Sequence, residues 1–151
     1  MKKIMSFIVC CFLLMINVVP TMALESDVYK DDKLYFEEII EIIDTQDSLL
    51  RATSTRTAKK TSTCKNSSGQ SLWSVTVTGT FNYNGSSATC TSSKVSTKIY
   101  NDAWKISSSS SSKSGNKATA KATGQEYFLG IAINSITRSV TLTCDGKGNV
   151  S

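Results

Sequence analysis

The chain has 151 residues, with 17 Lys or Arg, 12 Asp or Glu and no histidine, which gives a formal net charge of +5. This length suits one domain with appendages. The absence of histidine removes the commonest general base and the commonest zinc ligand, so single-chain Ser-His-Asp and Cys-His hydrolases are excluded. The sequence also lacks a phosphate-binding loop, a metal-ligand spacing and a nucleotide fingerprint. We therefore predict a protein without catalytic residues, metal or cofactor.

Residues 1–23 have the layout of a secretory signal peptide. Lys2 and Lys3 form a basic start, Ile4–Val19 is mainly apolar, and the small residue Ala23 closes the segment. A membrane anchor is the competing interpretation, but the apolar run is shorter than the roughly 18 residues expected of a spanning helix. We predict cleavage after Ala23, a secreted product, and no transmembrane anchor once the signal is removed.

The next segment, residues 24–55, is predicted to be an acidic amphipathic helix followed by a linker. Nine Asp or Glu and only two Lys lie between Leu24 and Leu50, whereas thirteen Lys or Arg and three acids follow from Arg51 onward. An asymmetry of this size suggests two pieces with different behaviour. The apolar residues that fall close to one helical face are Phe36, Ile39, Ile40, Ile43 and Leu50.

Two roles for this helix remain open. In the first, it packs its isoleucine face over the rest of the chain or lies in solvent. In the second, it is a prosegment that screens the basic domain by charge and is cleaved in the basic linker, at Arg51, Arg56 or Lys59-Lys60.

The remaining residues, 56–151, predict a mainly β domain: an antiparallel sandwich of about seven strands, either immunoglobulin-like or a small barrel. In the clearest strand, Ser71–Tyr83, apolar residues alternate with hydroxyl residues, and Asn84-Gly85 suits a hairpin turn. The apolar positions are Trp73, Val75, Val77, Phe81 and Tyr83. Further strands are expected over residues 95–100, 103–110, 117–123, 127–134 and 139–144, and the nearly continuous apolar run Tyr127–Asn134 is expected to lie buried in mid-sheet.

Three cysteines follow the signal: Cys64, Cys90 and Cys144. In an oxidising compartment two of them should pair. Cys90 and Cys144 are in phase with apolar residues, whereas Cys64 has polar neighbours. We therefore predict a Cys90–Cys144 disulfide between the sheets, which leaves Cys64 as a thiol able to join a partner. A disulfide from Cys64 to Cys90 or to Cys144 is the alternative.

The segment YNDAW is a candidate ligand-binding site. Its members are Tyr100, Asn101, Asp102 and Trp104. Proteins hold sugars with an aromatic ring for stacking and polar groups for the hydroxyls. The alternative is that Trp104, in phase with Ile106, belongs to the core and that Asn101-Asp102 is a turn.

A second candidate is a basic surface made by Lys94, Lys98, Lys105, Lys113, Lys117 and Lys121. Such a surface suits an anionic polymer, such as a cell-wall polymer or phospholipid headgroups, although ordinary solubility explains the same lysines. Because no arginine-rich or RNP-like motif accompanies the charge, we predict no specific nucleic-acid partner.

Three stretches of the β domain are distinctive: GQSLWSVTVTGTFNYNGSSATC, KSGNKATAKAT and RSVTLTCDGKGN. They resemble uncharacterised small secreted β-domain proteins of Gram-positive, Firmicutes-like bacteria, over roughly Thr63–Ser151. The resemblance implies export, a β domain and use of Cys90 and Cys144. We expect a secreted, non-enzymatic binding module for a cell-surface, glycan or anionic polymer. The alternative is a bacteriocin-like or toxin-like effector released from the acidic prosegment.

Overall fold

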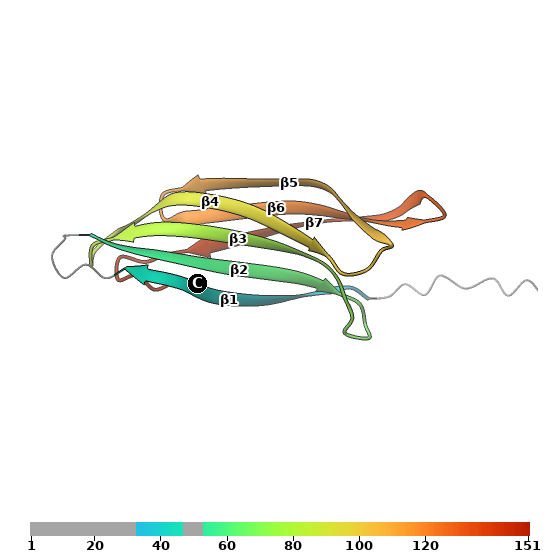
Figure 1. The fold of residues 1–151 in the computed structure, drawn as a ribbon, viewed down its shortest axis with the longest axis horizontal. Coiled ribbons are helices and arrows are strands. Elements are labelled where there is room, and N and C mark those ends of the chain that lie inside the picture. The colour runs from blue at the N-terminus through green and yellow to red at the C-terminus, as the bar shows by residue number, and fades with distance from the viewer. Residues whose placement is uncertain (1–32, 47–52) are drawn as a thin grey trace, which may run out of the picture. The chain divides into compact units, whose positions relative to one another are not determined.

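The computed structural model describes residues 33–46 and 53–151, which form antiparallel strands in two sheets (Figure 1). The strands are β1 (Tyr35–Gln46), β2 (Ser54–Lys65), β3 (Ser71–Tyr83), β4 (Ala88–Ile99), β5 (Trp104–Ser114), β6 (Lys117–Phe128) and β7 (Ile131–Thr143). The prediction of a mainly β protein is confirmed. The predicted signal peptide and its cleavage site at Ala23 lie outside the described residues. In the two described ranges, no helix is long and apolar enough to cross a membrane.

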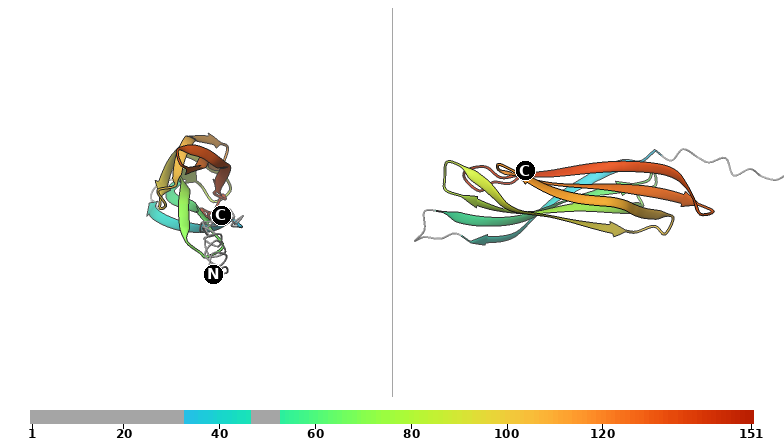
Figure 2. Two further views of the ribbon diagram at one scale, coloured as in Figure 1. Left: turned by 90° about the vertical axis from the view of Figure 1, so that its right-hand side faces the viewer. Right: turned by 90° about the horizontal axis from the view of Figure 1, so that it is seen from above.

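The sheets have the strand orders β1-β2-β3-β4 and β5-β6-β7, and they lie in two layers (Figure 2). Every strand pairs with its neighbour in sequence, except where β4 leaves one sheet and β5 starts the other. An immunoglobulin sandwich places non-consecutive strands side by side, so the immunoglobulin-like prediction is wrong. Two separate sheets also differ from a closed barrel. The fold is therefore sandwich-like: it has two antiparallel sheets, and within each sheet hairpins join consecutive strands.

The core lies between the two layers. On β3, Trp73, Val75, Val77 and Phe81 are fully buried, as the alternation predicts. The opposite layer supplies the small residues Ala118, Ala120 and Ala122, with Val140 and Leu142. The inward side chains of β6 are therefore small, which leaves room for the large side chains of β3.

The predicted helix is wrong where the structure describes it, because residues 35–46 form strand β1. This strand pairs with β2, and the described residues form one compact unit, so the boundary predicted at residue 56 does not separate two structural units. Isoleucines give β1 apolar positions on both of its faces, and this pattern also fits one helical face. β-Branched side chains favour strands, and pairing with β2 then decides the outcome.

The prediction of a buried strand over Tyr127–Asn134 is also wrong. The chain reverses within this run, because β6 ends at Phe128 and β7 begins at Ile131. Leu129 and Gly130 form the two-residue turn, with φ of 49° and 81°. The run is therefore the exposed tip of the β6–β7 hairpin.

Candidate functional site

The β4–β5 turn holds most of the YNDAW segment in a fixed conformation. The carbonyl of Leu72 accepts hydrogen bonds from the backbone N–H groups of Tyr100 (2.9 Å) and Asn101 (3.1 Å). The Asn101 side chain accepts a bond from Ala103 N (2.9 Å), and its carbonyl accepts one from Trp104 N (3.0 Å). Local side-chain bonds of this kind stabilise turns. The interpretation of Asn101-Asp102 as a turn is confirmed, and it leaves Tyr100, Asn101 and Asp102 exposed.

Trp104 is part of the core. Its side chain is 2% exposed and stacks on Trp73, with ring centroids 6.4 Å apart and an interplanar angle of 29°. A buried indole cannot stack on a sugar in solvent, so the proposal of Trp104 as a ligand-binding residue is wrong. The alternative interpretation, that Trp104 is in phase with the core, is confirmed.

Two lysines lie over tyrosine rings at this end of the molecule. The Lys98 Nζ is 4.7 Å from the centre of the Tyr100 ring, and the Lys105 Nζ is 4.9 Å from the centre of the Tyr127 ring. Each contact contributes about 0.5–1 kcal/mol at an exposed site and restricts where the ammonium group lies. Since Tyr127 was expected in mid-sheet, the sequence did not predict the second pair. To predict the contact between Lys105 and Tyr127 from the sequence, one would first have to place the β6–β7 turn at residues 129–130.

A backbone hydrogen bond joins two of the segments that carry these pairs, the β4–β5 turn and β6. Tyr127 N donates to Ala103 O at 2.7 Å, so the start of the β6–β7 tip is fixed to the β4–β5 turn. We use the name turn-end cluster for the residues Lys98, Tyr100, Asn101, Asp102, Lys105 and Tyr127. Four segments of the chain supply them: β4, the β4–β5 turn, β5 and β6.

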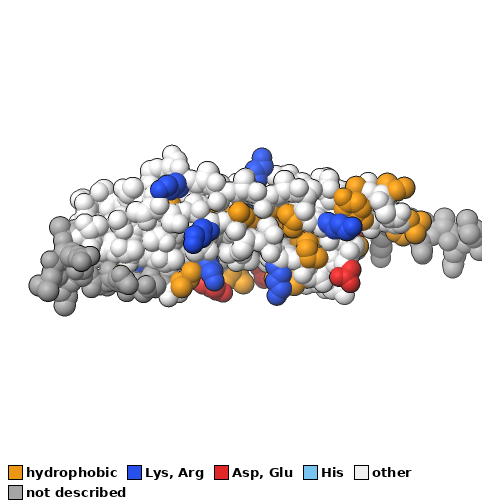
Figure 3. Space-filling model, turned by 45° about the horizontal axis from the view of Figure 1, so that its top comes forward, with side chains coloured by type: hydrophobic (Ala, Val, Ile, Leu, Met, Phe, Trp, Pro, Cys, Tyr) orange, Lys and Arg blue, Asp and Glu red, His pale blue; other side chains and the backbone are white. Residues whose placement is uncertain are grey.

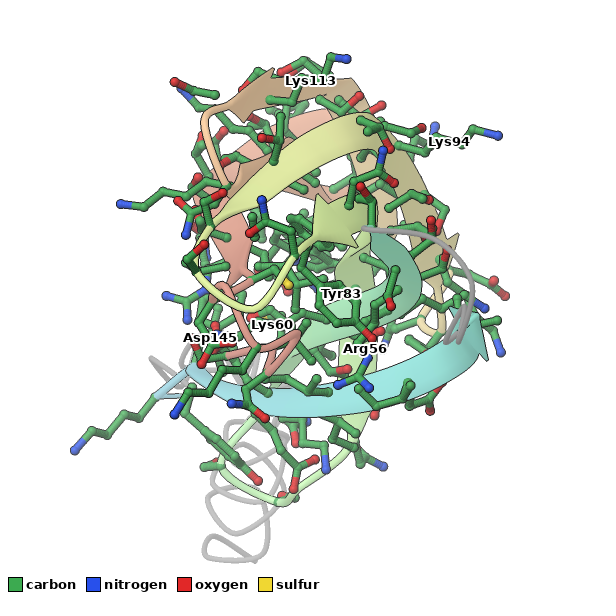
Figure 4. All side chains as sticks on the ribbon, turned by 90° about the vertical axis from the view of Figure 1, so that its left-hand side faces the viewer. Arg56, Lys60, Tyr83, Lys94, Lys113 and Asp145 are labelled. Carbon is green, nitrogen blue, oxygen red and sulfur yellow. The ribbon has the colours of Figure 1, made fainter. Side chains whose placement is uncertain are left out.

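The other lysines do not join this cluster. Lys94 lies opposite Thr78 in β3, near the middle of β4, and its side chain points outward (Figure 4). Lys113 lies at the far end of β5, where its Nζ donates to Thr91 O at 2.7 Å. Lys and Arg side chains are scattered over the face shown in Figure 3. The six predicted lysines therefore do not form one continuous basic surface.

The opposite end of the molecule is occupied by structural contacts. The Arg56 guanidinium lies 5.7 Å from the Tyr83 ring centre and donates to Gly148 O (Figure 4). Asp145 accepts hydrogen bonds from Lys147 N and Asn149 N, both at 2.8 Å. Hydrogen bonds from Asn149, above all from its side-chain amide, hold the pKa of the Asp145 carboxyl below its usual value. These contacts close the C-terminal turn.

Two of the predicted processing sites lie within a paired strand. Arg56 and Lys60 belong to β2, which is hydrogen-bonded to β1 on one side and to β3 on the other. A protease needs an accessible, extended segment, and this strand does not offer one in the folded protein. Arg51 lies outside the described residues.

All three described cysteines are buried free thiols, so the predicted Cys90–Cys144 disulfide is not formed in the structure. The placement of Cys90 and Cys144 in the core is confirmed. Cys64 was expected to face away from the core, but it is fully buried beside Trp73 and therefore cannot reach a partner. Its inward neighbours on β2 include the polar Ser62, which is why sequence alternation did not reveal it. Burial raises the pKa of the Cys64 thiol to about 11.

The described acids of the basic segment do not gather into one group. Asp102 lies on the β4–β5 turn, Glu126 opposite Trp104 on β6, and Asp145 at the other end of the molecule. Over residues 33–46 and 53–151, no three His, Cys, Asp or Glu side chains are grouped so that they could hold a metal ion. Comparison with protein-family models, with curated proteins and with solved structures found no match.

Proposed function

We propose that this protein is a secreted, non-enzymatic binding module that attaches to an anionic polymer or surface of a cell through the turn-end cluster. The observation that carries the proposal is the pair of lysines held over tyrosine rings at one end of the sandwich. Exposed side chains fixed on a rigid scaffold are typical of binding sites. The layout of the first 23 residues supports export.

The geometry favours an anionic ligand over a stacked sugar. A sugar stacks on the free face of an aromatic ring, whereas Lys98 already covers one face of Tyr100, and Lys105 covers one face of Tyr127. The two ammonium groups remain in exposed side chains and can contact phosphate or carboxylate groups. Asp102 lies on the same turn, and its carboxylate reduces the local positive charge.

Retention of the full chain on isolated bacterial wall and membrane fractions tests the proposal. Two lysines near an anionic surface contribute about 1 kcal/mol each. The double variant Lys98→Ala/Lys105→Ala should therefore bind roughly tenfold or more weakly, and added salt should weaken the unmodified chain in the same direction. Lys117→Ala/Lys121→Ala removes the same charge from the exposed lysines of β6 and is the matched control. Equal losses in the two double variants would contradict a local site.

Asp102→Asn distinguishes the two ligand classes by the sign of its effect. If the ligand is anionic, removal of this carboxylate tightens binding because a like charge is lost. If the ligand is a sugar, the carboxylate is an acceptor for its hydroxyl groups, and binding weakens. We expect tighter binding.

The alternative, an effector released from an acidic prosegment, fits the described residues less well. Release at Arg56 or Lys60 would cut β2 between its two paired neighbours, and any cut before β2 would separate β1 from its sheet. Mass spectrometry of the secreted protein tests this directly. We expect a chain that begins after Ala23 and still contains β1, and a species beginning between Arg51 and Lys60 would favour the effector.

A further inference from the structure

The tip of the β6–β7 hairpin exposes a run of large apolar side chains. The exposed fractions are 65% for Phe128, 86% for Leu129, 68% for Ile131 and 43% for Ile133. Hydrophobic side chains gather at that end of the molecule in the space-filling view (Figure 3). A contiguous exposed group of this kind marks an interaction site more often than single exposed apolar residues do.

The amino acid at the first position of the turn is unusual for the backbone conformation that it adopts. Leu129 has a φ of 49° and Gly130 a φ of 81°. Two-residue turns with positive φ favour Asn, Asp or Gly, because a branched apolar side chain is strained there. The two-residue β5–β6 turn of the same chain has a glycine, Gly115, at its positive-φ position. Leucine at the strained and most exposed position therefore suggests a function outside folding.

The shape of the tip suits a lipid bilayer better than a protein surface. The hairpin extends past the ends of the neighbouring strands (Figures 1 and 2). A typical protein interface needs about 800 Å² per partner over a broad patch, whereas this tip presents a few side chains on a narrow protrusion. The strands remain paired up to the turn, through Tyr127 with Ala132 and Phe128 with Ile131. Pairing limits the number of backbone groups left without partners in an apolar medium.

The turn-end cluster lies directly behind the tip, since Tyr127 precedes Phe128 and its N–H is bonded to Ala103 of the β4–β5 turn. Tyrosine and lysine suit the boundary between lipid tails and water, where an apolar body and a polar end are both accommodated. We propose that the β6–β7 tip inserts into the surface of an anionic phospholipid bilayer, while Lys98 and Lys105 contact headgroup phosphates. This proposal rests on the proposed function and specifies its partner. Amphipathic helices that lie in this interface bury their apolar faces to about 5–10 Å, and we expect a similar depth for the tip.

Sedimentation of the full chain with vesicles tests the proposal. One set contains phosphatidylglycerol mixed with phosphatidylcholine, and the other contains phosphatidylcholine alone. We expect binding to the mixed vesicles and weaker binding to the neutral ones. Leu129→Asn should weaken binding about tenfold, because one large apolar side chain leaves the lipid. The same variant should fold at least as stably, because asparagine tolerates positive φ. Ile39→Thr, at the 56% exposed Ile39 of β1, is the matched control and should bind normally.

Insertion has its own spectroscopic readout. Phe128→Trp places an indole at the tip, whereas Trp73 and Trp104 are buried and should not respond. We expect a blue shift of the emission on anionic vesicles and quenching by brominated lipid chains. Vesicle binding without a shift, or unchanged binding of Leu129→Asn, would overturn insertion.

Three further outcomes test this proposal together with the proposed function. If the chain binds wall fractions through Lys98 and Lys105 but does not bind vesicles, the membrane partner is wrong and the binding module stands. If neither material is bound, both are wrong. If Leu129→Asn instead dissociates an oligomer of the free protein in analytical ultracentrifugation, the tip contacts a second copy of the chain, and insertion is overturned.

Discussion

Arg138 of β7 donates a hydrogen bond to Glu38 of β1 at 2.7 Å, although the two residues are 100 positions apart. Lys60 of β2 lies 3.4 Å from the same carboxylate. Glu38, on the edge strand β1, is therefore held by one cation of its own sheet and one of the other sheet. Two acids of β1 thus pair with cations of the basic segment: Glu38 with Lys60 and Arg138, and Glu37 with Lys65 of β2.

The Glu38 contacts predict a loss of stability in acid. Burial alone would raise the pKa of Glu38, but the Arg138 hydrogen bond and the Lys60 charge outweigh it and lower the pKa below 4.5. The associated stability is thus present above pH 4.5 and disappears as the pH falls through the lowered value. Urea midpoints should fall more steeply below pH 4.5 in the unmodified chain than in Glu38→Gln. Glu41→Gln, on the exposed side of β1, should keep the unmodified slope, and a flat profile for all three proteins would contradict the contact.

The Trp73–Trp104 stack predicts a large cost for Trp104→Ala. Removal of a buried indole typically costs about 3–5 kcal/mol, through lost burial and the cavity left behind. Tyr100→Ala, four residues earlier and 46% exposed, should cost less than about 1 kcal/mol. Denaturant unfolding of the two variants measures the difference. Similar midpoints would mean that Trp104 is not a core residue.

Gly124 predicts a steric effect on the same aromatic pair. A Cβ at this position would lie 2.6 Å from the Trp73 Nε1, which is closer than real contacts allow. Gly124→Ala should therefore lower the free energy of unfolding by about 1–3 kcal/mol through overpacking. Lys121→Ala, an exposed position of the same strand, should have little effect. A stabilised Gly124→Ala would show that the indole lies elsewhere.

The Cys64 thiol predicts slow alkylation and a loss of stability in alkali. Because burial raises its pKa from 9.0 to about 11, the reactive thiolate is scarce in the folded protein below pH 9. Iodoacetamide should label Cys64 rapidly only after unfolding, as peptide mass spectrometry can measure. The folded state binds the thiol proton more tightly than the unfolded state, so stability should fall between pH 9 and about 11. That alkaline slope should be smaller in Cys64→Ala, and an equal slope would contradict the assignment.

The alternation of apolar and polar residues predicted those parts of the fold that depend only on residues close together in sequence. The inward positions of β3 and the core position of Trp104 follow from it, and so does the reversal of the chain after Tyr83. The predicted tight turn at Asn84-Gly85 is instead a four-residue connection, Asn84–Ser87, in which Gly85 has a positive φ and Asn84 does not. β1 could not be predicted in this way, because isoleucines on both faces of an edge strand imitate a helical stripe. Its stability depends on partners such as Arg138, which the sequence places far away.

The candidate site was only partly predictable, for a related reason. Tyr100, Asn101, Asp102 and Lys98 are neighbours in sequence and remain together in the structure. The Lys105–Tyr127 pair depends on where β6 turns into β7, and a leucine at a positive φ gives no turn signal. Because Leu129 is apolar, the sequence around it predicts one buried strand, although these residues form the exposed tip of the hairpin.

Lysine footprinting tests the central claim, that the turn-end cluster is the binding surface, most directly. The full chain is acetylated with limiting reagent, free and bound to bacterial wall or membrane fractions, and each lysine is quantified by mass spectrometry. We predict protection of Lys98 and Lys105 on binding, with Lys117 and Lys121 unchanged. Protection of Lys117 and Lys121 instead, or equal labelling of all four lysines in the bound and free protein, would contradict the claim.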